Sequence, residues 1–141
     1  MTNPRSLRSP HAVPAAAPAD LGRLAGPALR TFFAIAQAWR LTNEEAMRLL
    51  GEPGRSTYFE WKRAGDGRLD RDTLERISYV LGIYKALQIL LPDPAAADAW
   101  VRKPNAAPMF GGQSALARML SGNVADLYVV RQYLDAVRGG A

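Results

Sequence analysis

Residues 72–91 constrain the fold more than any other segment, because apolar side chains occupy two faces of one predicted helix. The residues on the first face are Leu74, Ile77, Leu81 and Tyr84, and those on the second are Val80, Ile83, Leu87 and Leu90. A helix that is apolar on more than one face is normally buried between layers. We therefore expect N-terminal helices to pack on one side of this segment and C-terminal helices on the other.

The remaining sequence also favours helices. Apolar residues recur at helical spacing in residues 29–39 and 124–137. Thr42, with Glu45 three residues later, forms a capping-box pattern, and further helix starts are predicted at Asp72, Asp93, Ser114 and Asn123. No segment shows sustained strand alternation, and no internal repeat is present. The predicted fold class is therefore all-α.

Composition divides the chain into three parts. Residues 1–27 are rich in proline and alanine and bury too little apolar surface to offset chain ordering, which predicts a disordered tail. The alternative for this tail is an arm that enters the minor groove of DNA through Arg5 and Arg8. Residues 28–91 and 92–141 are predicted to form two small helical domains.

The sequence contains few of the residues and motifs that enzymes commonly use for catalysis. It has no cysteine, and its single histidine, His11, lies in the predicted tail. Without a phosphate-binding glycine loop or a metal-ligand cluster, we expect no catalytic residues, no metal site and no cofactor. No apolar run reaches the roughly 20 residues of a membrane span, and no apolar segment of a signal peptide follows Arg5 and Arg8. We expect a cytoplasmic protein, whose net charge of +5 permits binding to nucleic acid.

Residues 42–63 are typical of two short helices joined by a turn. Gly51 permits a sharp change of chain direction, and the helix after it would present its N-terminal turn to a DNA groove. This segment resembles a helix-turn-helix of the Xre type. Tyr58 and Trp61 should anchor the second helix, which leaves six DNA-binding candidates on its outer side: Arg55, Ser56, Thr57, Phe59, Lys62 and Arg63.

Two features of this segment depart from the family pattern. Glu52-Pro53-Gly54 lengthens the turn by one residue, and both Glu52 and Glu60 put negative charge near the proposed DNA face. Two alternatives to DNA binding therefore stay open. One is an ordinary three-helix core in which Tyr58 and Trp61 only pack, and the other is a family member that no longer binds DNA.

Residues 93–120 carry the most specific pattern in the chain. Trp100 is followed by Pro104-Asn105, by Gly111-Gly112 and by a helix that Ser114 caps. Alone, these residues predict a loop between two helices that pack on a buried tryptophan. Their order and spacing resemble the C-terminal toxin-binding domain of the Xre/MbcA/ParS antitoxin family, although Ala115 stands where the family commonly has proline. The resemblance implies a helix-turn-helix bundle of the Xre type followed by a small helical toxin-binding domain.

The same resemblance implies a function. Members of this family neutralise RES-domain toxins, which consume or use NAD, by placing the C-terminal end of a dimeric domain against the toxin's active site. The residues that it nominates for toxin binding are Pro104, Asn105, Phe110, Gly111, Gly112, Arg131, Asp135 and Arg138. For Arg131 and Arg138 the alternative is a solvated arginine near a helix C-terminus, where the helix dipole favours a cation.

The predicted partners are a cognate RES-domain toxin, operator DNA and a second copy of the chain, with no membrane. The expected function is an antitoxin that covers the active site of its toxin and represses its own operon. The alternative is a stand-alone helix-turn-helix regulator without a toxin partner.

Overall fold

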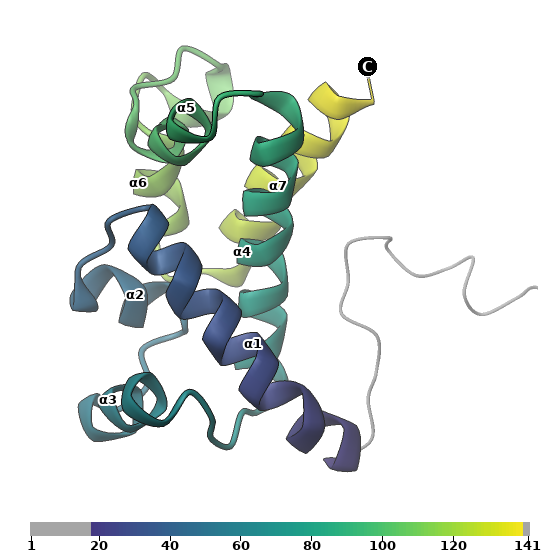
Figure 1. Cartoon of the computed structure of the whole chain (residues 1–141). Helices are drawn as coiled ribbons and strands as arrows, with labels where there is room; N and C mark the ends of the chain where they lie inside the picture. The colour runs from purple at the N-terminus through teal and green to yellow at the C-terminus, as the bar shows by residue number, and fades with distance from the viewer. Residues whose placement is uncertain (1–17, 140–141) are drawn as a thin grey trace, which may run out of the picture.

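The computed structural model describes residues 18–139, and this part of the chain contains helices and no β-strand (Figure 1). Its helices, in order, are α1 (Pro18–Ala38), α2 (Asn43–Leu49), α3 (Arg55–Ala64), α4 (Arg71–Leu90), α5 (Pro94–Ala99), the 3₁₀ turns η2 (Trp100–Arg102) and η3 (Pro108–Phe110), α6 (Ala115–Met119) and α7 (Val124–Arg138). The predicted all-α fold is confirmed. None of the described helices is long and apolar enough to cross a membrane.

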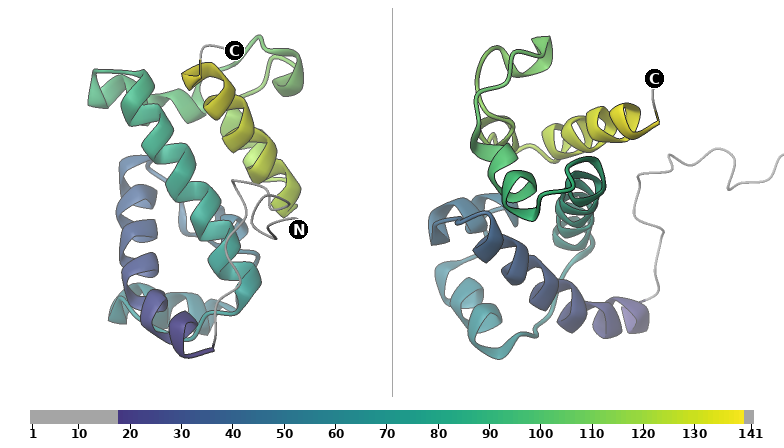
Figure 2. Two further views of the ribbon diagram at one scale, coloured as in Figure 1. Left: turned by 90° about the vertical axis from the view of Figure 1, so that its right-hand side faces the viewer. Right: turned by 45° about the horizontal axis from the view of Figure 1, so that its top comes forward.

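Helix α4 lies at the centre of the molecule, as its two apolar faces predict. Its buried apolar side chains are Leu74, Ile77, Tyr79, Val80, Ile83, Ala86 and Leu87. Helix α1 packs on one side of α4 and α7 on the other, which Figure 2 shows in its left view. The predicted start at Asp72 is wrong, because Asp70 caps the helix by accepting a hydrogen bond from the backbone N–H of Thr73.

Helix α1 is longer than predicted and takes in part of the segment that was assigned to a disordered tail. Residues 18–27 are helical, with Pro27 inside the helix. Pro18 stands at the first helical position, where a missing backbone N–H costs nothing. Tertiary packing supplies the reason for the extension, since Ala25 is fully buried and continues the apolar face of Leu29 and Phe32. The remainder of the predicted tail, residues 1–17 with His11, lies outside the described residues.

Helix α7 begins differently from its prediction. Asn123 occupies the N-cap position but its side chain makes no capping hydrogen bond. The Ser121 hydroxyl instead accepts from the backbone N–H of Asn123 and donates to the carboxylate of Asp126. The apolar stripe of α7 ends at Leu134, which is buried, whereas Val137 at the end of the predicted stripe is 46% exposed.

Candidate functional site

The turn between α2 and α3 accommodates its additional residue with two consecutive left-handed residues. Gly51 has φ of 89° and Glu52 has φ of 61°. The backbone N–H of Glu52 donates to the carbonyl of Met47 at 2.9 Å, which closes the C-terminus of α2. The Glu52 carboxylate also lies 3.2 Å from Nη1 of Arg48, so one of the two acidic residues near the proposed DNA face is paired within the turn.

The inner side of α3 is fixed by the two aromatic residues that the sequence assigned to this role. Tyr58 is 1% exposed and Trp61 is 7% exposed, so both predicted anchors are buried. The Tyr58 hydroxyl donates to Oδ1 of Asn43 on α2 at 2.9 Å, and burial raises the pKa of this phenol. Trp61 packs closely on Gly67, where a Cβ atom would lie 2.2 Å from the indole Cδ1.

All six DNA-binding candidates lie on the exposed side of α3: Arg55, Ser56, Thr57, Phe59, Lys62 and Arg63. The three cations among them have partners within the chain. The Arg63 guanidinium donates twice to the Glu60 carboxylate, and these bonds lower the pKa of Glu60. Lys62 donates to Oδ1 of Asn43 at 2.9 Å. Arg55 lies 3.7 Å from Glu44 of α2, with its guanidinium carbon 5.3 Å from the ring centroid of Phe59.

The loop between η2 and α6 is closed by its own backbone around Asn105. Asn105 donates through its N–H to the carbonyl of Gln113 at 2.9 Å, and its carbonyl accepts from Gly112 at 3.1 Å. Its side-chain oxygen accepts from the N–H of Ala107 at 2.9 Å. Gly111 and Gly112 have φ of 57° and 83°, a conformation that favours glycine, although the space around each would admit a Cβ atom.

Two aromatic residues of this region differ in burial from what the sequence predicted. Phe110, nominated for toxin binding, is only 5% exposed and contacts Trp100 and Tyr133 edge-to-face at centroid distances of 6.2 Å and 5.4 Å. Trp100, predicted to be a core residue, is half-buried because η2 places it at the rim of the core. It lines an apolar hollow of about 210 Å³ together with Leu90 of α4 and Val137 of α7.

The three nominated residues of α7 have different surroundings. Arg131 pairs with Asp135 one turn later, with Nε and Oδ2 3.0 Å apart, and both side chains are largely buried. The Arg131 guanidinium lies on the backbone of α4 at Gly82, where a Cβ atom would lie 1.5 Å from Nη1. Arg131 and Asp135 therefore help to hold α7 against α4. Arg138, at the end of α7, is exposed.

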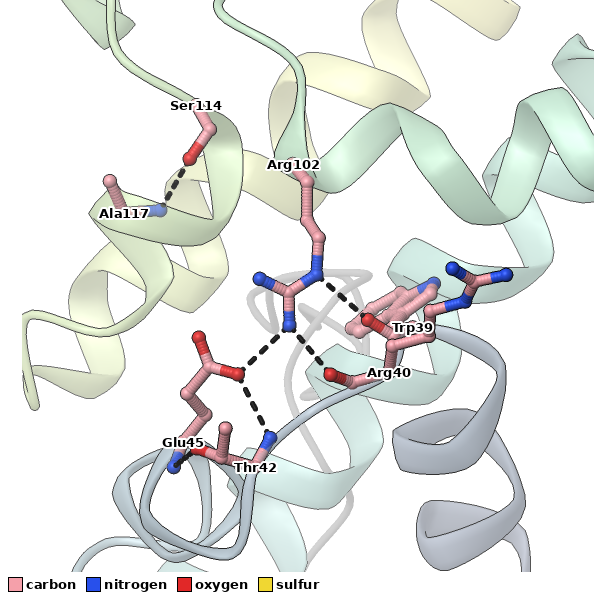
Figure 3. A network of polar contacts seen from close by, with 7 residues as sticks. All are labelled: Trp39, Arg40, Thr42, Glu45, Arg102, Ser114 and Ala117. Atoms are coloured by element: carbon pink, nitrogen blue, oxygen red, sulfur yellow. Dashed lines mark hydrogen bonds and ion pairs between the residues drawn. The ribbon is translucent and has the colours of Figure 1, made fainter.

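A residue that the sequence analysis missed joins the two halves of the chain. The Arg102 guanidinium donates from Nε to the carbonyl of Trp39 at 3.0 Å and from Nη2 to the carbonyl of Arg40 at 2.8 Å. Nη2 also donates to Oε1 of Glu45 at 2.9 Å, so one side chain from η2 reaches both the end of α1 and the start of α2 (Figure 3). No local sequence pattern marks this role, since the partners lie about 60 residues away in the chain.

The carboxylate that Arg102 reaches also belongs to the predicted capping box of α2, which is confirmed. Glu45 accepts from the backbone N–H of Thr42 at 2.9 Å, and the Thr42 hydroxyl accepts from the N–H of Glu45 at 3.0 Å. Partial burial opposes ionisation of Glu45, but the hydrogen bonds from Thr42 and Arg102 outweigh it and lower its pKa. A second link joins α2 to the C-terminal half, because Arg48 donates to the carbonyl of Leu120 at 2.9 Å.

Comparison with known proteins matches two family models to successive parts of the chain, and the boundary between the two matches falls within α4. Residues 9–82 match the family model of the antitoxin Xre-like helix-turn-helix domain, and residues 86–140 match that of the antitoxin Xre/MbcA/ParS C-terminal toxin-binding domain. Protein y4oB of Sinorhizobium fredii is 50% identical over 140 residues, which cover 99% of this chain and 100% of that protein. Among residues 18–139 no group of three His, Cys, Asp or Glu side chains could hold a metal ion. The chain belongs to the Xre/MbcA/ParS antitoxin family, with a helix-turn-helix domain followed by a toxin-binding domain.

Proposed function

We propose that this chain neutralises a cognate RES-domain toxin in the cytoplasm and, as a homodimer, represses its own operon by binding operator DNA. The observation that carries the proposal is the match of residues 86–140 to the toxin-binding domain of the family. The exposed side of α3, with its three cations, supports the second activity.

Toxin capture is assigned to the exposed parts of the C-terminal half. Pro104, Gly111 and Gly112 lie on the outer side of the closed loop, and Arg138 extends from the last turn of α7. A cation at this place suits an active site that binds an anionic dinucleotide such as NAD. Phe110, Arg131 and Asp135 contribute indirectly, because their contacts position the loop and α7.

Truncation of α7 tests toxin capture. A chain that ends at Asp135 keeps the buried Leu134 and the Arg131–Asp135 pair but loses Arg138. Co-expressed with a cognate RES-domain toxin, the truncated chain should leave the toxin active, and cellular NAD should fall. An Arg138→Ala chain of full length separates the role of the cation from that of the helix end. Full protection by the truncated chain would contradict active-site covering by the C-terminus.

Operator binding is tested separately, with a double Arg55→Ala and Arg63→Ala chain in gel shifts at several salt concentrations. Each lost specific contact should weaken binding by about 1–3 kcal/mol, and the salt dependence should fall if phosphates are contacted. A stand-alone regulator would bind DNA in the same way but would leave a RES-domain toxin fully active. Unchanged DNA binding by the folded double variant would show that α3 is not the reading helix.

A further inference from the structure

We propose that Arg55 and Phe59 act as one unit that reads a thymine adjacent to a guanine in the major groove, and so set the base specificity of α3. This inference rests on the proposed DNA binding by α3 and goes beyond it, because it names two reading residues and the bases that they select.

The two side chains are held together on the outer face of α3. Arg55 is the first residue of the helix, and Phe59 follows four residues later, so both lie on one face. The guanidinium carbon is 5.3 Å from the ring centroid, within the range of a cation–π contact. Phe59 in turn packs edge-to-face on the buried Tyr58 at 5.0 Å, which fixes the ring relative to the core. Both groups are therefore placed before DNA arrives.

Of the three cations on α3, Arg55 can most readily leave its partner within the chain and bind DNA. Lys62 and Arg63 stand in the last turn of the helix and are hydrogen-bonded to Asn43 and Glu60. The contact of Arg55 with Glu44 is longer, at 3.7 Å, and the two side chains are 63% and 72% exposed. Exposed ion pairs of this kind contribute little free energy, so Glu44 can release Arg55 to a base. The N-terminal turn of the second helix is moreover the part that approaches base edges in a helix-turn-helix.

The chemistry of the two side chains selects the two bases. An arginine guanidinium donates two hydrogen bonds to O6 and N7 of guanine, which is the commonest specific contact in the major groove. A phenylalanine ring makes an apolar contact with the C5-methyl group of thymine. Successive bases are about 3.4 Å apart along a strand, so groups separated by 5.3 Å reach neighbouring base pairs. Phe59 is 38% exposed, which leaves ring area for a methyl group.

The experiment begins by selecting bound sites from a pool of random DNA duplexes with the full chain. In the selected site, each thymine is replaced in turn by uracil, which lacks only the methyl group. Each guanine is replaced by 7-deazaguanine, which lacks the N7 acceptor. Affinity should fall about fourfold at one uracil. At the adjacent 7-deazaguanine, which keeps O6, the fall should be at most the roughly 5- to 150-fold worth of the complete bidentate pair.

The variants assign each loss to one side chain. Phe59→Ala should bind the thymine and uracil duplexes equally while it keeps the guanine effect, and Phe59→Leu should retain most of the methyl effect. Arg55→Ala should lose the guanine effect alone. Arg63→Ala is the matched control: it removes a cation of the same helix and should weaken binding to all the duplexes by the same factor, so that both base effects persist. The Arg55 and Arg63 side chains are 63% and 72% exposed, so the melting temperatures of their alanine variants should match that of the unmodified chain. Phe59→Ala also removes the ring contact with Tyr58, so its binding is measured well below its own melting temperature.

The possible failures are distinguishable. If no site is enriched from the pool, DNA binding by this chain is wrong and the inference falls with it. If a site is enriched but contains no thymine beside a guanine, or if the variants keep both base effects, DNA binding stands and the reading by Arg55 and Phe59 is overturned.

Discussion

Replacing Arg102 by alanine should destabilise the whole chain, because this side chain closes the end of α1 and binds the start of α2. Two residues after the end of α1, Arg40 has a left-handed conformation with φ of 55°, and the N–H of Leu41 donates to the carbonyl of Ala36. Arg102 binds two carbonyls just beyond the last helical residue, those of Trp39 and Arg40, and places a cation at the negative end of the helix dipole.

The expected loss follows from these three interactions and from their exposure. Hydrogen bonds that involve a charged group are worth about 1.5–3 kcal/mol each when they are sheltered from water. The Arg102 side chain is 41% exposed, so each of its two bonds to carbonyls is reduced to about 1 kcal/mol. The pair with Glu45 adds at most about 1 kcal/mol. We expect Arg102→Ala to lower the free energy of unfolding by about 2–3 kcal/mol.

Thermal or urea unfolding of the full chain measures this loss. A change of 2–3 kcal/mol should lower the melting temperature by on the order of 10 °C in a chain of this size. Lys103→Ala is the matched control, since it removes the adjacent exposed cation, and the hydrogen bond of its backbone N–H to Trp100 is retained. If the free energy of unfolding of Arg102→Ala lies within about 0.5 kcal/mol of that of the control, the Arg102 hydrogen bonds do not stabilise the fold as argued.

The effect of Arg102→Ala should also depend on pH with a defined sign. The pKa of Glu45 in the folded chain lies below its ordinary value of 4.5. The ionised carboxylate therefore contributes stability that is present above pH 4.5 and is lost as the pH falls through the lowered pKa. The difference between the unmodified chain and Arg102→Ala should be larger near neutral pH than in acid. A difference that grows on acidification would contradict the role of Glu45.

Three further predictions follow from packing. Gly67→Ala should cost about 1–3 kcal/mol in urea unfolding, because its Cβ would overlap the buried indole of Trp61. Phe110→Ala should cost about 3–5 kcal/mol by the same assay, whereas an exposed toxin contact would leave stability unchanged. A fragment of residues 1–91 should melt well below the full chain or aggregate, because removal of α7 exposes one apolar face of α4. An equal melting temperature would show that the N-terminal domain is independent.

Local patterns in the sequence were sufficient for much of the fold. The capping residues Thr42, Asp93 and Ser114 each make the predicted side-chain hydrogen bond, because capping depends on residues within one turn. The helix that is apolar on two faces lies between layers for a similarly direct reason. The N-terminal limit of α1 was predicted wrongly, since proline content suggested a tail, whereas burial of Ala25 in the folded chain favours helix.

The candidate sites were harder to predict, because their residues are defined by contacts between distant segments. Nothing in the sequence around Phe110 indicates that Trp100 and Tyr133 enclose its ring. The role of Arg131 depends on Gly82, which lies almost 50 residues earlier and provides the space for the guanidinium. A glycine inside an otherwise apolar helix was the one available signal, since such a residue commonly marks a close approach.

Helix α2 belongs to the helix-turn-helix domain and also contacts the toxin-binding domain. Its Glu45 and Arg48 are bound to the C-terminal half through Arg102 and the carbonyl of Leu120. Its first turn also supplies Asn43 and Glu44, which contact Lys62 and Arg55 on the exposed side of α3. If α3 binds operator DNA as proposed, we expect a substitution in the toxin-binding half to alter DNA affinity without any contact to DNA, because it would displace α2 and with it the partners of the α3 cations. Weaker operator binding by Arg102→Ala would be evidence that α2 couples the two domains. If the salt dependence of binding equals that of the unmodified chain, the weaker binding does not come from the loss of a phosphate contact.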